Sequence, residues 1–108
     1  MEATANKKES FGEIIHGNKP VLVDFYADWC APCRMMKPVL EELHRRMGDK
    51  LRILKIDTDR SPAIAEQLQI RSIPTLILFQ KGKLLWRHAG AMQPAQLEKI
   101  ISEHSINQ

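Results

Sequence analysis

The stretch that decides the fold is Val21-Leu22-Val23-Asp24-Phe25-Tyr26-Ala27-Asp28-Trp29-Cys30-Ala31-Pro32-Cys33. Its first seven residues are almost continuously apolar, a pattern typical of a strand buried on both faces of a sheet. After the second cysteine, apolar residues recur at helical spacing as far as Met47, so a helix is expected to begin near Pro32. The cysteines therefore lie where a strand ends and a helix begins. Open α/β sheets place their functional sites at such points.

The rest of the chain predicts an α/β protein. The expected strands are 21–27, 51–57, 75–79 and 83–88, the last two joined by a tight turn. Helices are expected after the capping-box pattern Ser10–Glu13, after Cys30, after Ser61-Pro62 and from Pro94. This order predicts a mixed β-sheet with helices on both of its faces. Met35 and Met36 are expected in the core beneath the second helix.

Length and composition bound the class of protein. The 108 residues suit one domain spanning 1–108, in which residues 1–9 are either frayed or a short edge strand. The net charge is +3, but the basic residues are interspersed with acidic ones and lack interleaved aromatics, so a nucleic-acid surface is not expected. No apolar run approaches the roughly 20 residues that span a bilayer, and the N-terminus lacks the apolar core of a signal peptide. We expect a cytoplasmic monomer that does not enter a membrane.

The only two cysteines, Cys30 and Cys33, are three positions apart. On a helix such residues share a face about 5–6 Å apart, close to the Cβ separation of about 3.5–4.5 Å that a disulfide needs. The pair is therefore expected to cycle between dithiol and disulfide. Cys30, at the helix end, is expected to be the more exposed and to attack as a thiolate. Cys33, one turn inward, is expected to resolve the mixed disulfide.

Two other uses of the cysteine pair are weaker. A zinc site would need about two more ligands, and the four histidines form no suitably spaced pair. A purely structural disulfide closing so short a loop would stabilise the fold little. Asp24 is an independent signal, because a carboxylate inside an apolar strand is either buried with a raised pKa or hydrogen-bonded at a sheet edge. The residues alone leave both possibilities open.

At this point the chain resembles the thioredoxin family over nearly its whole length. The residues that carry the resemblance are Val21 to Cys33 as quoted above, Pro38, Lys55-Ile56-Asp57, Ile70-Arg71-Ser72-Ile73-Pro74-Thr75 and Gly90-Ala91. The resemblance implies the thioredoxin fold and a protein-disulfide reductase with no bound cofactor or metal. It also implies two kinds of partner, disulfide-containing client proteins and a separate thioredoxin reductase that supplies electrons from NADPH.

The resemblance also assigns roles around the cysteines. It implies that Asp24 relays the proton of Cys33 with Lys55 as its charge partner, and that Pro74 is cis beside the disulfide. The main chain of Ile73 would then pair with an extended substrate. The implied substrate patch consists of Trp29, Ala31, Pro32, Ile73, Pro74, Gly90 and Ala91. Two positions depart from the family pattern: Ala31 stands where glycine is usual, and Tyr26 stands where many members have tryptophan.

Two alternatives to a reductase remain open from the sequence. One is a disulfide oxidase or isomerase in an oxidising compartment. The other is a redox-inactive binding module built on the same fold. Asp57 and Asp59 have a plainer expected role, serving a strand end and the turn before Ser61.

Overall fold

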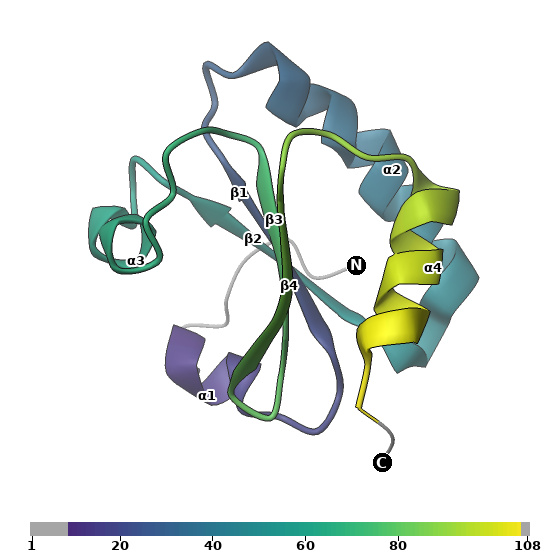
Figure 1. The fold of residues 1–108 in the computed structure, drawn as a ribbon. Helices are drawn as coiled ribbons and strands as arrows, with labels where there is room; N and C mark the ends of the chain where they lie inside the picture. The colour runs from purple at the N-terminus through teal and green to yellow at the C-terminus, as the bar shows by residue number, and fades with distance from the viewer. Residues whose placement is uncertain (1–8, 107–108) are drawn as a thin grey trace.

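The computed structural model, which describes residues 9–106, is organised around a mixed sheet with the strand order β2-β1-β3-β4 (Figure 1). The strands are β1 (Val21–Tyr26), β2 (Arg52–Asp57), β3 (Thr75–Gln80) and β4 (Lys83–Ala89). The helices are α1 (Phe11–Ile15), α2 (Ala31–Met47), α3 (Pro62–Gln67) and α4 (Pro94–His104), with a 3₁₀ turn η1 (Gly48–Lys50) after α2. Helices α2 and α4 cover one face of the sheet, and α1 and α3 cover the other (Figure 1). The predicted architecture is confirmed.

Strand β1 lies inside the sheet, as its apolar sequence predicts. It pairs in parallel with β2 and antiparallel with β3, so that Val23 stands between Leu54 and Ile77. The strand boundaries differ from the predicted ones by a single residue, since β1 ends at Tyr26 and β2 begins at Arg52. Because β1 is an inner strand, the residues that follow its carboxyl end lie near the middle of that end of the sheet.

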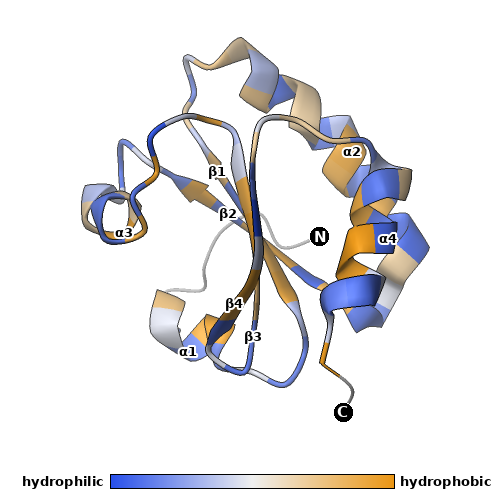
Figure 2. Ribbon diagram, in the orientation of Figure 1, coloured by the Kyte–Doolittle hydropathy of each residue, from blue (hydrophilic) through white to orange (hydrophobic). Residues whose placement is uncertain are grey.

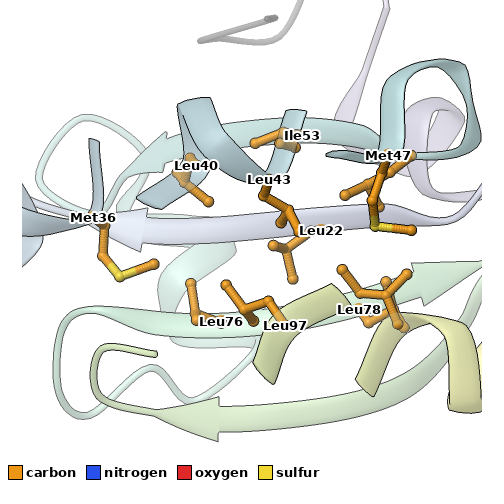
Figure 3. Close-up of a cluster of buried hydrophobic side chains, with 11 residues drawn as sticks. Leu22, Met36, Leu40, Leu43, Met47, Ile53, Leu76, Leu78 and Leu97 are labelled. Carbon is orange, nitrogen blue, oxygen red and sulfur yellow. The ribbon is translucent and has the colours of Figure 1, made fainter. Parts of the chain in front are cut away.

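Side chains alternate along the strands and build two separate cores. The core under α2 and α4 contains Leu22, Met36, Leu40, Leu43, Met47, Leu51, Ile53, Leu76, Leu78, Leu97 and Ile101, most of which Figure 3 shows. The core under α1 and α3 contains Ile14, Val21, Val23, Phe25, Leu54, Ile56, Ile77 and Phe79. In Figure 2 the strands carry stretches of hydrophobic residues, and the helices show hydrophobic and hydrophilic residues in turn. This pattern is what one buried face per helix requires.

The residues that the sequence predicts to start or end helices and to form turns do so in the structure. The Ser10 hydroxyl accepts from the amide of Glu13 at 3.1 Å, and the Glu13 carboxylate accepts from the amide of Ser10 at 3.0 Å, which completes the capping box. Gly48 ends α2 with a φ of 53°, a conformation that glycine adopts without steric cost. The β3–β4 turn is made by Lys81 and Gly82, with φ of 54° and 78°.

Two expectations need comment. Met35 is 70% exposed, so its placement in the core was wrong, whereas Met36 is fully buried as expected. The expectation for residues 1–9 falls almost wholly outside the described residues. Of these, only Glu9 is described, in a bend where it forms an ion pair with Arg52 at 3.0 Å. Between residues 9 and 106, none of the helices has the length and apolar character needed to cross a bilayer.

Candidate active site

The two cysteines lie at the junction of β1 and α2, as predicted. Cys30 is the N-cap of α2, in an extended conformation (φ −90°, ψ 110°), and Pro32 occupies the first turn, where its missing N–H leaves no hydrogen bond unmade. A disulfide joins Cys30 to Cys33, whose Cα atoms are 5.3 Å apart. The helix thus begins one residue earlier than predicted, at Ala31, and holds the second sulfur in its first turn.

The backbone directs hydrogen-bond donors and positive potential toward the sulfur of Cys30. The amide of Cys33 donates to Cys30 Sγ at 3.2 Å. The other free amides of the first turn and the helix dipole also favour negative charge at this point. In the dithiol form these groups stabilise a thiolate on Cys30, which is the species that attacks disulfides.

The difference in exposure expected between the two cysteines is very small. Cys30 is 4% exposed and Cys33 is 3% exposed, so both lie beneath the surface. The chain before β3 contributes to this burial, because the carbonyl oxygen of Ile73 lies 3.7 Å from Cys30 Sγ. What distinguishes Cys30 from Cys33 is the amide that points at its sulfur.

The Ile73-Pro74 peptide bond is cis, as the resemblance implied. The carbonyl oxygen of Pro74 accepts from the amide of Gly90 at 2.8 Å. The structure thus brings three separated segments together around Cys30: the start of α2, residues 73–74, and the loop after β4. In the implied patch, Trp29, Ala31, Pro32 and Ala91 are exposed, Ile73 and Gly90 are half-buried, and Pro74 is buried.

Trp29 is held by Asp59, a residue for which the sequence predicts only a turn. Its side chain is 70% exposed, and its indole Nε1–H donates to Asp59 Oδ2 at 3.0 Å. The amide of Asp59 donates in turn to Asp57 Oδ1 at 2.8 Å. Asp59 therefore fixes the orientation of the aromatic ring beside Cys30. Nothing in the local sequence pattern links the two residues.

Asp24 is fully buried, and neither of its carboxylate oxygens has a hydrogen-bond partner. Burial raises the pKa of this carboxyl from 3.8 to about 6, and the positive charge of Lys55 offsets part of that rise. Lys55 stands directly opposite Asp24 in the parallel β1–β2 register. The buried alternative for Asp24, with a raised pKa, is therefore the correct one.

A hollow of about 250 Å³ borders Cys33 on the side of Lys55. Its lining residues are Tyr26, Ala27, Asp28, Cys33, Arg34, Lys37 and Lys55. Three of them are cationic, and the Arg34 guanidinium is held by the carbonyl oxygen of Asp28 at 2.7 Å. The hollow thus borders Cys33 with three cationic side chains and one carboxylate, that of Asp28.

Metal chemistry has no matching site in the part of the chain that the structure describes. No group of three or more histidine, cysteine or acidic side chains between residues 9 and 106 could hold an ion. What the site does hold is a pair of sulfur atoms, those of Cys30 and Cys33, joined as a disulfide at the start of α2. Fold and site together define a thiol–disulfide oxidoreductase.

Comparison with known proteins identifies the family. The thioredoxin family model matches residues 2–103. A thioredoxin-like protein of Synechocystis sp. is 52% identical over 89 residues, which make up 82% of this chain and 85% of that protein. A bifunctional thioredoxin reductase/thioredoxin of Mycobacterium leprae is 45% identical over 93 residues, which make up 86% of this chain and 20% of that protein.

A solved structure supports the same assignment. Oxidised mitochondrial thioredoxin 3 from Saccharomyces cerevisiae matches with a TM-score of 0.77 and 40% identity, over 86% of each chain. The chain belongs to the thioredoxin family. It is a protein-disulfide reductase, and Cys30 and Cys33 form its redox centre.

Proposed function

We propose that this protein reduces client disulfides in a cycle in which Cys30 attacks, Cys33 resolves and Asp24 takes the proton of Cys33. The observation that carries the proposal is the amide of Cys33, which donates to Cys30 Sγ at 3.2 Å. In the reduced protein, the Cys30 thiolate attacks one sulfur of the client disulfide. A Cys30–client bond forms, the client disulfide breaks, and the released client sulfur takes up a proton.

Resolution is the second half of the cycle. Cys33 passes its proton to the Asp24 carboxylate, and its thiolate attacks Cys30 Sγ. The Cys30–Cys33 bond forms, the Cys30–client bond breaks, and the client leaves as a dithiol while the protein is oxidised. Asp24 suits this role because its pKa of about 6 lets it accept and release a proton near neutral pH. The resolving thiolate is thus generated where it is used.

Clients are proposed to bind as an extended segment across the patch beside Cys30. The main chain of Ile73 would pair with that segment as an added strand. The exposed ring of Trp29, oriented by Asp59, would cover the segment from the other side. Such a site would contact the client's main chain and apolar surface and not a particular sequence, which suits a protein that acts on many different clients.

Recharging needs an external donor of two electrons. We propose a thioredoxin reductase that passes them from NADPH to the Cys30–Cys33 disulfide. The relative from Mycobacterium leprae, whose name describes a bifunctional thioredoxin reductase/thioredoxin, supports this pairing. We also propose that the chain works in the reducing cytoplasm, because it has just two cysteines and both serve the redox centre. Cell fractionation with an antibody against the protein tests the location.

The reductase proposal is tested by following the precipitation of insulin as dithiothreitol reduces it. The unaltered protein is expected to accelerate precipitation, and Cys30→Ser is expected to abolish the acceleration. Cys33→Ser is expected to trap clients as mixed disulfides that dithiothreitol releases. Full activity in Cys30→Ser would overturn the assigned nucleophile. Failure of Cys33→Ser to trap any client would favour a redox-inactive binding module.

A redox titration against glutathione separates reductase from oxidase. A reductase is expected to be more reducing than the glutathione pair used in the titration. An oxidising potential of about −120 mV would instead favour the oxidase or isomerase alternative.

A further inference from the structure

Tyr26 has a contact that the proposed cycle does not use. It is the last residue of β1, two positions after Asp24, so its side chain lies on the same face of the sheet as that carboxyl. The ammonium of Lys55 lies 4.7 Å from the centroid of the Tyr26 ring. An ammonium over the face of an aromatic ring at this distance is attracted by the ring's quadrupole. Tyr26 is therefore in contact with the cation proposed to act on Asp24.

Lys55 needs such a contact to have a defined position. Among residues 9–106, no ion pair or hydrogen bond is formed by its ammonium, and both Asp24 oxygens lack a hydrogen-bond partner. The charge of Lys55 acts on Asp24 through space, and that influence falls as the ammonium moves away. A lysine stem has four rotatable bonds, so without a contact at its end the ammonium would spread into the adjoining hollow.

We propose that Tyr26 is a positioning residue whose ring holds the Lys55 ammonium beside Asp24 and so keeps that carboxyl ready to receive the Cys33 proton. The inference rests on the proposed function and deepens it, because it names a residue that sets the pH range in which Asp24 can accept a proton during the resolving step. Tyr26 itself touches no reacting atom. Its hydroxyl is not needed, since the attraction comes from the ring face.

Other charged groups surround this pair and are shared by every variant compared. Asp57 lies on β2 opposite Tyr26, Asp28 lies in the turn before α2, and Arg34 and Lys37 lie on α2. Arg60, after β2, is 4.0 Å from Asp28 and 3.7 Å from Asp57. Cys33 is the remaining titratable group of the hollow in the reduced protein. The experiment therefore changes only the ring and compares titrations of the same carboxyl.

The first test titrates Asp24 by carbon NMR in Tyr26→Leu and Tyr26→Phe. The measurement needs no turnover, and it is made on both the oxidised and the reduced protein. A neighbouring cation lowers a carboxyl pKa by about 1–3 units when it is fixed, so Tyr26→Leu is expected to raise the midpoint by roughly 0.3–1 pH unit. Tyr26→Phe keeps the ring and is expected to titrate as the unaltered protein does. If Tyr26→Leu does not fold, Tyr26→Met is the second ringless variant.

The second test follows the resolving step in single-turnover reactions across pH. In Tyr26→Leu the acid limb of the resolution rate is expected to move to higher pH by the same amount, while the attack by Cys30 keeps its pH profile. In a Lys55→Met background, Tyr26→Leu is expected to cause no further shift, because the cation that the ring holds is absent.

Three results would overturn the inference. They are an unchanged midpoint in Tyr26→Leu, an equal shift in Tyr26→Phe, and a shift that persists in the Lys55→Met background. The last would mean that the ring acts by packing alone. Failure of the unaltered protein to reduce insulin would refute the proposed function instead, and the NMR titration would still decide the role of Tyr26.

Discussion

Burial of Asp24 lowers the stability of this protein at neutral pH, and replacing the carboxyl by an amide should remove the penalty. The pKa of Asp24 is about 6 in the folded protein, against an ordinary value of 3.8. Between these values the unfolded chain has released its proton while the folded protein still holds it. The free energy of unfolding therefore falls as pH rises through this window. The full difference corresponds to about 3 kcal/mol, reached above pH 7.

Asp24→Asn has nearly the same shape and does not ionise. Its free energy of unfolding, minus that of the unaltered protein, is expected to rise by about 3 kcal/mol between about pH 3.5 and pH 7.5. Urea denaturation of the oxidised proteins at several pH values measures this difference, and the contributions of the other ionisable groups largely cancel. Asp49→Asn is the matched control, because Asp49 is exposed in η1. Its difference from the unaltered protein is expected to change little with pH.

The result that would refute this reasoning is a difference between Asp24→Asn and the unaltered protein that does not depend on pH. A variant that becomes relatively less stable as pH rises would refute it more strongly. Either outcome would mean that the buried carboxylate is stabilised by contacts other than the charge of Lys55. The proposed role of Asp24 as a proton acceptor near neutral pH would then lose its electrostatic basis.

Two further predictions concern packing and backbone. Leu40→Ala, at a fully buried position of α2, is expected to lower the free energy of unfolding by about 2–5 kcal/mol. Met35→Ala, at a position that is 70% exposed, should change the free energy of unfolding by no more than about 0.5 kcal/mol in urea denaturation. Equal losses in Leu40→Ala and Met35→Ala would contradict the assigned buried and exposed faces of α2. Gly82→Ala places a Cβ 2.5 Å from the His16 ring at a φ of +78°, so a loss of about 1–3 kcal/mol is expected. Gly12→Ala in α1, where the nearest atom is 3.9 Å away, should gain about 0.5 kcal/mol in thermal unfolding; a gain in both variants would refute the argument.

Much of the fold could be predicted because its signals are local. A continuous apolar run marks β1, because a central strand is buried on both faces. Capping residues mark the start of α1, and the Lys81-Gly82 pair marks the β3–β4 hairpin. The cysteine pair could be placed for the same reason, since three positions at the start of a helix fix both the spacing and the dipole. Each of these features depends on neighbours within about one helical turn.

Most of what the sequence did not predict depends on contacts between distant segments. Met35 fits a helical pattern of apolar residues, yet α2 turns only the stripe from Met36 to Met47 toward the sheet. Cys30 is covered because Ile73 is packed beside it from 43 residues away. Asp59 reaches Trp29 across 30 residues. For Cys30 and Trp29 the deciding neighbour is set by the tertiary fold, and neither residue pattern nor spacing encodes it. Met35 differs, because the spacing of Met36, Leu40, Leu43 and Met47 along the helix already leaves Met35 off the buried stripe.

The division of the interior into two cores has a consequence for how such a protein can change. Asp24, Tyr26 and Lys55 take strand positions on the α2 side of the sheet, whereas the side chains of the layer beneath α1 and α3 project from the opposite face. Conservative substitutions in that distal layer are therefore expected to change the free energy of unfolding more than the reactivity of the Cys30–Cys33 pair. The sheet thus separates the α2 side of the molecule, where sequence changes affect the reacting groups directly, from the α1 and α3 side, where sequence changes are expected to be better tolerated.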